Sequence, residues 1–339
     1  MLDTYFHPVV GNLVEAPDGA DGAPQADLAS RAEAWQKRGM KQLMLLAAAP
    51  LLLAAQAVEP PATPGEIVAA TTADDWRPIV ADNLLVMTLG NGSAVYIELA
   101  ASFAPIHVAN IRRLAREGWY DGISINRVQD NYVVQWGDAT QSKALPIGIE
   151  TEPPAEYDFA MADTYLADFT NVQDGNYEQY SGYLGGWPVG HSPREDGQRS
   201  GTLVHCYGMV GVGRGSDPDT GNGAELYTVI GHAPRHLDRN IALVGRIVEG
   251  IGALSSLPRG TGPLGFYEEE SQRVPIASIA LASTLPEAEQ PRFEVMRTDS
   301  DAFRAYVDAR ANRTGWFVRP ARAVDVCNVN LPIRRVTGS

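Results

Sequence analysis

The chain has 339 residues, of which 45% are apolar and 20% are charged, a composition typical of a globular protein and not of a disordered one. Its formal net charge of -14 argues against a general nucleic-acid-binding protein, because such proteins need a basic surface to neutralise phosphates. The same charge disfavours binding to an anionic membrane surface.

A secretory signal is the first feature that the sequence predicts. A short basic segment precedes an apolar run over residues 43–55, and small residues follow, which is the order of regions in a signal peptide. We therefore expect residues 40–57 to be a signal peptide and residues 1–39 to be a disordered upstream extension. A membrane anchor fits less well, since the run is shorter than about 20 residues and contains Pro50. The mature protein is expected in the periplasm without a membrane anchor.

The segment after the signal, residues 58–75, is rich in Pro and Ala without periodicity, and we expect a linker there. Folding should start near Trp76. Two strands are predicted over residues 84–89 and 94–99, because both segments are apolar and the Gly, Asn and Ser residues between them are typical of a hairpin turn.

An amphipathic helix is predicted next, with Pro105 at an early position and Gly118 past its end. Two short apolar strands should follow, joined by a polar turn at residues 129–131, and Arg127 lies in the first of them. One interpretation is an edge-strand charge whose stem is packed and whose head is in water. The other is a working residue of a site, and the pattern alone leaves both open.

The stretch from Tyr120 to Asp138, YDGISINRVQDNYVVQWGD, resembles the signature of the cyclophilins, F-H-R-[IV]-x-x-x-[FY]-[MV]-x-Q-G-G-D. Asn126 stands in place of a histidine and Trp136 in place of a glycine. The residues that match are Arg127, Tyr132, Gln135, Gly137 and Asp138.

Later segments resemble other parts of the same family in the same order. MVGVG at residues 209–213 and NGAELY at residues 222–227 resemble a strand and a loop that follow the signature, and HLDRNIALVGRIVEG, from His236, resembles the family's W-L-D-x-x-[HYF]-x-x-F-G-x-V-x-x-G segment. Because several segments in register rarely arise by chance, the chain is identified as a member of the cyclophilin-type peptidyl-prolyl isomerases over roughly residues 83–283.

The resemblance implies a mainly β fold, a closed antiparallel barrel flanked by helices, and we expect a monomer. The barrel should span residues 76–285, with a long insertion at residues 139–199 whose aromatic residues cover the barrel or, as the alternative, hold a partner. Residues 286–339 should form an extension that packs on the barrel, with a helix from about Asp301 and a strand over residues 324–329.

The implied function is isomerisation of X-Pro bonds in exported, proline-containing polypeptides, with Arg127 as the catalytic residue. A guanidinium is always charged and always a donor, so it is suited to hydrogen-bond the prolyl nitrogen and weaken the amide resonance. No metal or cofactor is implied. The alternative is a binding or chaperone module that holds such segments without turnover. The implied substrate-binding residues are Tyr132, Val133, Gln135, Val210, Gly211, Glu225, Tyr227, His236 and Leu237.

Three positions depart from the family pattern near this site. Glu225 replaces a glutamine, so it is placed to pair with Arg127 and compete with substrate, while His236 replaces a tryptophan and Ile241 an aromatic residue or histidine. The two cysteines are far apart in sequence and pair only if folding brings them together. A disulfide and two unrelated thiols both remain open.

Other combinations of polar residues are weaker candidates for a site. His232 and His236 have a metal-ligand spacing, but Pro234 lies between them and no third ligand follows. The acidic residues at 217–219 miss the spacing of an EF-hand, and the glycines at 211–215 lack the third glycine of a dinucleotide fingerprint. We therefore interpret both of these segments as loops.

Overall fold

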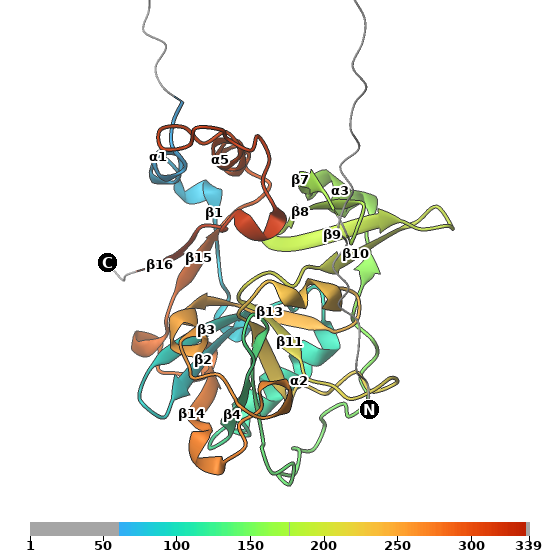
Figure 1. Cartoon of the computed structure of the whole chain (residues 1–339), viewed down its shortest axis with the longest axis vertical. Coiled ribbons are helices and arrows are strands. Elements are labelled where there is room, and N and C mark those ends of the chain that lie inside the picture. Colours follow the sequence, from blue (N-terminus) through green and yellow to red (C-terminus); the bar gives the residue numbers. More distant parts are fainter. Residues whose placement is uncertain (1–60, 176, 337–339) are drawn as a thin grey trace, which may run out of the picture. The chain divides into compact units, whose positions relative to one another are not determined.

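The computed structural model describes residues 61–175 and 177–336, all within one compact unit that spans residues 59–339. The predictions for residues 1–39 and for the signal peptide at 40–57 lie outside the described residues. Figure 1 shows the chain coloured along its sequence.

Eight strands close into an antiparallel barrel, so the predicted fold class is confirmed (Figure 1). Around the barrel the order is β11-β12-β5-β4-β14-β2-β3-β13, and β13 pairs with β11 to close it. The hairpin β2–β3 has its predicted bounds, since its alternating apolar residues point into the barrel. The barrel strands are β2 Leu84–Leu89, β3 Ala94–Leu99, β4 Ser124–Val128, β5 Val133–Gly137, β11 Met209–Val212, β12 Leu226–Val229, β13 Leu243–Glu249 and β14 Val274–Leu281.

Helix α2, Pro105–Arg116, is also present as predicted and packs against β14. It starts with proline at its first position, where the missing N–H costs nothing. Val108, Ile111 and Leu114 recur at helical spacing and are fully buried in the barrel core. A shorter helix, α4 Ile251–Ser255, follows β13.

The long insertion forms a second antiparallel sheet, which we call the insertion sheet, in the order β6-β10-β9-β8-β7. Its last strand ends at Leu203, beyond the predicted boundary at residue 199. The element bounds are β6 Phe159–Ala160, α3 Asp163–Asp168, β7 Thr170–Asp174, β8 Tyr180–Leu184, β9 Trp187–Pro193 and β10 Arg199–Leu203.

Glycines let aromatic rings approach the backbone of the insertion sheet closely, and this explains why its sequence lacks a strand pattern. A Cβ on Gly182 would be 2.7 Å from Cζ of Phe169, and a Cβ on Gly201 would be 2.7 Å from Cζ of Phe159. Side chains from the sheet, the barrel and the C-terminal extension share one apolar cluster. Its buried members include Val133, Tyr183, Trp187, Leu203, Tyr227, Leu243 and Phe303.

Part of the expected linker is helical, which corrects the prediction for residues 58–75. Helix α1, Pro64–Ala69, begins with a capping box in which Thr63 and Glu66 bond each other's backbone N–H groups. Ile67 and Val68 pack against the shared apolar cluster, and α1 contacts α5 of the C-terminal extension. Because this helix is only six residues long, its pattern was too short to recognise.

The C-terminal extension supplies two strands of a three-stranded sheet and the helix predicted near residue 301. The sheet order is β1-β15-β16, with β1 Trp76–Pro78, β15 Phe293–Met296 and β16 Ile333–Arg335. Helix α5, Asp301–Ala311, is capped by the Ser300 side chain and buries Phe303 and Tyr306, as expected. Phe293 and Val295 of β15 form a small apolar cluster with Leu84 of the barrel.

The strand predicted at residues 324–329 is wrong, because Val326–Asn328 is a short 3-10 helix. The Asp325 side chain accepts a hydrogen bond from the N–H of Cys327 at 2.8 Å, which starts the turn. Cys327 forms a disulfide with Cys206, so the structure decides the question that the sequence left open. The bridge joins the C-terminal extension to the segment between β10 and β11.

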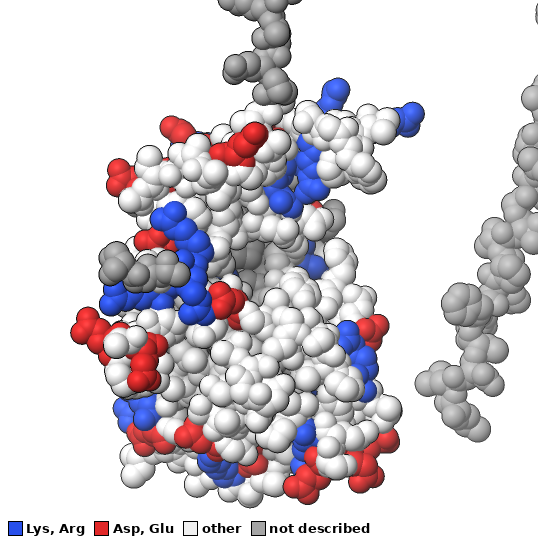
Figure 2. Space-filling model, turned by 90° about the vertical axis from the view of Figure 1, so that its left-hand side faces the viewer, with Lys and Arg blue, Asp and Glu red and all other residues white. Residues whose placement is uncertain are grey.

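Acidic and basic side chains are interspersed on the face of the molecule shown in Figure 2. Within residues 61–175 and 177–336, no helix is long and apolar enough to cross a membrane. The same described residues contain no group of three His, Cys, Asp or Glu side chains placed to hold a metal ion.

Candidate active site

Arg127 lies on β4, half-buried, and three groups of the protein hold its guanidinium. Its Nε donates to the Leu264 carbonyl oxygen at 2.7 Å, and its Nη1 donates to Oε1 of Gln135 at 2.9 Å. Its Nη2 donates to Oε1 of Gln129. A guanidinium has five N–H bonds, so among the described residues one N–H on each terminal nitrogen is left for a ligand.

Two aromatic rings flank the same guanidinium. Its central carbon lies 5.5 Å from the centre of the Tyr132 ring and 5.4 Å from that of Phe266. Burial lowers the pKa of Arg127, while Tyr132 and Glu225 act in the opposite direction. An arginine remains charged under all ordinary conditions, so the site presents a fixed cation between apolar surfaces.

Glu225 does not form the ion pair with Arg127 that its position suggested. Within the part of the chain that the structure describes, no salt bridge joins the two side chains, and Gln135 lies between them. The Gln135 Nε2 donates to Oε1 of Glu225 at 2.6 Å, while its Oε1 accepts from Arg127. Because a carboxylate can only accept, Glu225 fixes the orientation of the Gln135 amide and thereby that of Arg127.

This geometry predicts the effect of two substitutions at Glu225. Glu225→Gln keeps an oxygen that accepts from Gln135, so kcat/KM for an X-Pro peptide should stay within about twofold of the wild type. Glu225→Ala leaves the Gln135 amide free to turn, and kcat/KM should fall about fivefold, the effect of one lost hydrogen bond. A severalfold gain in Glu225→Gln would instead mean that the carboxylate competes with substrate for Arg127.

The residues expected to surround a proline ring are mostly together. Tyr132, Val133 and Tyr227 belong to the shared apolar cluster, with Val133 and Tyr227 buried and Tyr132 half-buried. The exposed His236 stacks on Tyr132 at a centroid distance of 5.7 Å, and its Nε2 lies 3.1 Å from the tyrosine hydroxyl. Leu237 is half-buried beside His236, at the end of the 3-10 helix Ala233–Leu237, but is not a member of this cluster.

Val210 and Gly211 lie on β11, which is paired on both sides. The Val210 side chain points into the barrel core, so only its backbone faces the site. The pairing of β11 with β13 shifts register between these two residues, and such a bulge leaves backbone groups outside the ladder. Gly211 lies under Tyr227, since a Cβ there would be 2.4 Å from the Tyr227 hydroxyl.

A cavity of about 520 Å³ lies next to the polar side of this site. Glu225 forms part of its wall, and so do Gly215, Asp219 and Gly221 of the neighbouring loop. The Asp219 carboxylate there accepts hydrogen bonds from the N–H groups of Gly215 and Gly221 at 2.6 Å and 2.8 Å. This segment is therefore a loop held by hydrogen bonds within itself, as expected from acidic residues that lack EF-hand spacing.

The two departures within the signature are structural substitutions. Asn126 is buried and donates to the Gly137 carbonyl oxygen at 3.1 Å, which ties β4 to β5. Trp136 is fully buried in the barrel core. Neither side chain is among the described hydrogen-bond partners of Arg127.

Four contacts of the site were not predicted from the sequence. Gln129 was interpreted only as a turn residue, and Leu264 and Phe266 lie in a loop about 137 residues further along the chain. His205, which hydrogen-bonds Tyr227, precedes the matching residues 209–213 and was assigned no role. A loop that closes through a backbone carbonyl leaves no side-chain signal in the sequence.

Three comparisons relate the chain to known proteins. The family model "Cyclophilin type peptidyl-prolyl cis-trans isomerase/CLD" matches residues 84–281. A probable peptidyl-prolyl cis-trans isomerase of Brucella suis biovar 1 is 24% identical over 197 residues, which cover 58% of this chain and 79% of that protein. Peptidyl-prolyl cis-trans isomerase B of Bacillus subtilis is 38% identical over 68 residues, 19% of this chain and 48% of that protein.

A solved structure extends the likeness beyond the barrel. The crystal structure of cyclophilin AquaCyp293 from Hirschia baltica matches with a TM-score of 0.64 and 26% identity, over 82% of this chain and 99% of that chain. Because 82% of the chain is more than the stretch that the family model matches, the structural likeness includes segments outside residues 84–281.

Proposed function

Because the chain belongs to the cyclophilin-type peptidyl-prolyl cis-trans isomerases, whose family model matches more than half of it, we propose that Arg127 catalyses its isomerase reaction. The observation that carries this proposal is the guanidinium itself. It is held by three acceptors beside a cluster of aromatic and apolar side chains, and within residues 61–175 and 177–336 one N–H on each terminal nitrogen has no partner.

The reaction needs a donor more than it needs acid–base chemistry. Rotation about an X-Pro bond must break amide resonance, at a barrier of roughly 18 to 20 kcal/mol. A donor aimed at the prolyl nitrogen competes for the lone pair that gives the C–N bond its double-bond character. A thousandfold acceleration requires about 4 kcal/mol, and one charge-assisted hydrogen bond contributes roughly 1.5 to 3 kcal/mol.

The apolar side of the site holds the proline ring in this proposal. Tyr132, Val133 and Tyr227 provide the wall, and Leu237 and His236 the edge. The backbone at the bulge between Val210 and Gly211 and the amide of Gln135 bind the flanking peptide. Every step is bond rotation, so no group of the protein has to gain or lose a proton.

A chaperone-like module that binds proline-containing segments without turnover is the competing function. An isomerisation assay on an X-Pro peptide, with peptide binding measured on the same samples, separates the two. The proposal expects turnover and binding in the wild type, and binding with turnover reduced about 100-fold in Arg127→Ala. Equal turnover in both proteins would refute the role of Arg127, and binding without turnover in the wild type would favour the module.

We also propose that the clients are exported polypeptides. The order of basic, apolar and small residues before residue 58 supports export. The Cys206–Cys327 bridge is consistent with an oxidising compartment, where disulfides form and persist. Expressed from its full sequence in a Gram-negative host, the protein should appear in the periplasmic fraction with its N-terminus near residue 58, as read by mass spectrometry. A cytoplasmic product that starts near Met1 would contradict this proposal.

A further inference from the structure

A buried chain of hydrogen bonds ends at Tyr227, the ring that the proposed function places in the wall of the proline pocket. The Tyr227 hydroxyl lies 2.9 Å from Nε2 of His205, whose side chain is fully buried. On the other side of the imidazole, Nδ1 lies 2.7 Å from Oδ1 of Asp238. The second carboxylate oxygen accepts from Nε of Arg235 at 2.9 Å.

The Asp238 carboxylate determines which atoms donate in this chain of hydrogen bonds. A carboxylate only accepts, so Nδ1 of His205 carries a proton, and in the neutral ring Nε2 is then an acceptor for the Tyr227 hydroxyl. Burial raises the pKa of Tyr227 well above its ordinary value, so the hydroxyl keeps its proton to donate. Without His205 this hydroxyl would be a buried polar group with no partner in the described part of the chain.

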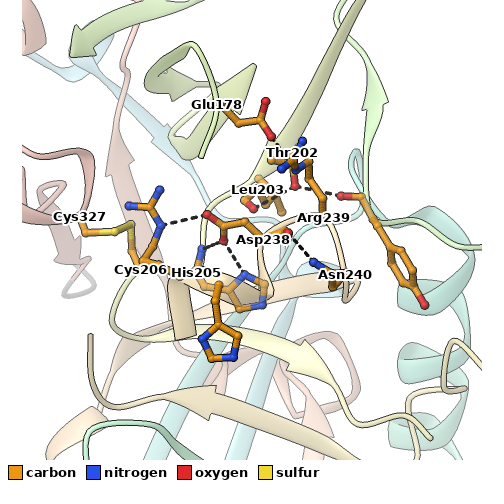
Figure 3. Close-up of polar contacts among 12 residues, drawn as sticks. Glu178, Thr202, Leu203, His205, Cys206, Asp238, Arg239, Asn240 and Cys327 are labelled. Carbon is orange, nitrogen blue, oxygen red and sulfur yellow. Dashed lines mark hydrogen bonds and ion pairs between the residues drawn. A yellow bond between two sulfur atoms is a disulfide. The ribbon is translucent and has the colours of Figure 1, made fainter. Parts of the chain in front are cut away.

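The same carboxylate also organises the neighbouring backbone. Oδ1 of Asp238 accepts from the N–H of His205 at 2.9 Å, in addition to the imidazole. Asp238 directly follows Leu237, the residue at the edge of the pocket. Figure 3 shows Asp238 between His205 and the segment of Arg239 and Asn240, with the disulfide of Cys206 beside it.

The hydrogen bond of its hydroxyl group helps to hold the Tyr227 ring in place. It lies over Gly211, where there is no side chain to hold it, and its ring plane is within 8° of that of His205. The hydroxyl is therefore the one polar group by which the ring is anchored among the described residues. A rotation of this ring would change the width of the pocket beside Val133.

We propose that His205, oriented by Asp238, is a positioning residue that fixes the Tyr227 ring as the wall of the proline pocket. This inference rests on the proposed function, since it assigns the ring its role in binding the proline. His205 does not touch the reacting bond in this proposal. It acts on substrate binding, so its loss should raise KM and leave kcat nearly unchanged.

Two substitutions of His205 separate its two hydrogen bonds. The side-chain amide of Asn occupies the place of Nδ1, so His205→Asn keeps the bond to Asp238 and loses the bond to Tyr227. The amide of Gln reaches the place of Nε2, so His205→Gln keeps an acceptor for Tyr227. In both variants Asp238 still accepts from Arg235 and from the backbone N–H at position 205.

The experiment measures kcat and KM for an X-Pro peptide, with thermal unfolding of each variant as a check on folding. His205→Asn and Tyr227→Phe should each raise KM about fivefold, the effect of one neutral hydrogen bond, with kcat within about twofold. His205→Gln should stay within about twofold of the wild-type KM. His205→Asn combined with Tyr227→Phe should be no worse than either alone.

A matched control is His191→Asn, because His191 is another buried histidine, on β9 of the insertion sheet, that rests against Phe169 and Tyr180. Its KM should equal that of the wild type. Wild-type KM in both His205→Asn and Tyr227→Phe would overturn the inference, as would equal effects of His205→Asn and His205→Gln.

Failure of the inference and failure of the proposed function give different results. If Arg127→Ala matches the wild type in turnover, the proposed function fails, whatever the His205 variants do. If Arg127→Ala shows the expected loss of turnover while His205→Asn and Tyr227→Phe keep the wild-type KM, only the positioning role of His205 fails.

Discussion

Replacing Arg127 with alanine should lower kcat/KM for an X-Pro peptide about 100-fold and leave the dissociation constant of the peptide within about threefold. The first expectation follows because one charge-assisted hydrogen bond to the transition state is removed. The second follows because the apolar wall of Tyr132, Val133 and Tyr227 remains. The ratio of kcat/KM between the wild type and Arg127→Ala should also stay constant between about pH 6 and 9, since an arginine does not titrate there.

Arg127→Lys tests whether geometry matters as well as charge. A lysine has a single ammonium group, so it cannot bond Leu264, Gln135 and Gln129 together and still offer free donors in a fixed plane. We expect a loss of at least tenfold in kcat/KM. Arg113→Ala, on the exposed face of α2, is the control and should behave as the wild type. Full activity in the lysine variant would show that a positive charge alone is sufficient.

The largest expected effect on stability comes from a buried ion triad that joins the barrel to the insertion sheet. Oε1 of Glu98 on β3 accepts from Arg77 at 2.7 Å, and its Oε2 accepts from Nη2 of Arg246 on β13 at 2.6 Å. Arg246 stacks on the ring of Trp187 on β9 at 4.4 Å, and Arg77 donates to the Gly185 carbonyl oxygen at 3.1 Å. One carboxylate therefore neutralises two cations at this junction.

Glu98→Gln should lower the free energy of unfolding by about 3–5 kcal/mol, because it leaves two cations without a counter-charge, one of them fully buried. Urea unfolding followed by circular dichroism measures this loss. The control is Glu117→Gln, which removes an exposed pair with Arg113 and should change the free energy by less than about 1 kcal/mol. Equal unfolding midpoints for the wild type and Glu98→Gln would show that the triad contributes nothing net.

The pH dependence of stability follows from the same carboxylate. Burial raises the pKa of Glu98, but Arg246 and Arg77 outweigh it, so its pKa in the folded protein is below the ordinary value of 4.5. A lowered pKa in the folded state means that the carboxylate stabilises the fold above the unfolded-state pKa and stops doing so as the pH falls through the folded-state value. Its contribution should thus be complete at neutral pH and decline below about pH 4.5. The difference between the wild type and Glu98→Gln should shrink accordingly.

The barrel was predictable because its local signals agree with its tertiary structure. In the hairpin at residues 84–99, apolar alternation and a Gly- and Asn-containing turn indicate the same register that the barrel requires. In helix α2 the early proline and the spacing of Val108, Ile111 and Leu114 do the same. Where local and global preferences coincide, reading the pattern is sufficient.

The insertion sheet and the turn at residues 324–329 could not be predicted from the sequence, and in both cases the reason is physical. In the sheet, Gly182 and Gly201 stand where apolar side chains would mark a strand, because aromatic rings from other segments fill those places. At residues 324–329 the valines that suggested a strand are Val326 and Val329, buried three residues apart around a turn that the Asp325 side chain starts.

The sequence predicted which residues form the site but not the hydrogen bonds between them. The residues around Arg127 were identified from the motif, and the structure brings Tyr132, Gln135 and Glu225 to one place. The sequence left open whether Glu225 pairs with Arg127, and in the structure the Gln135 amide lies between the two groups. Spacing in a sequence shows which side chains are near each other, but a bridging amide depends on rotamers that only packing decides.

The most direct test of the central claim is a crystal structure of the protein with an X-Pro peptide bound. The proline ring should lie against Tyr132, Val133 and Tyr227, with a terminal nitrogen of Arg127 about 3 Å from the prolyl nitrogen. The bonds of Arg127 to Gln135 and Leu264 should persist in the complex. A proline ring bound elsewhere, or an Arg127 that stays beyond hydrogen-bond distance of the prolyl nitrogen, would contradict the proposed mechanism.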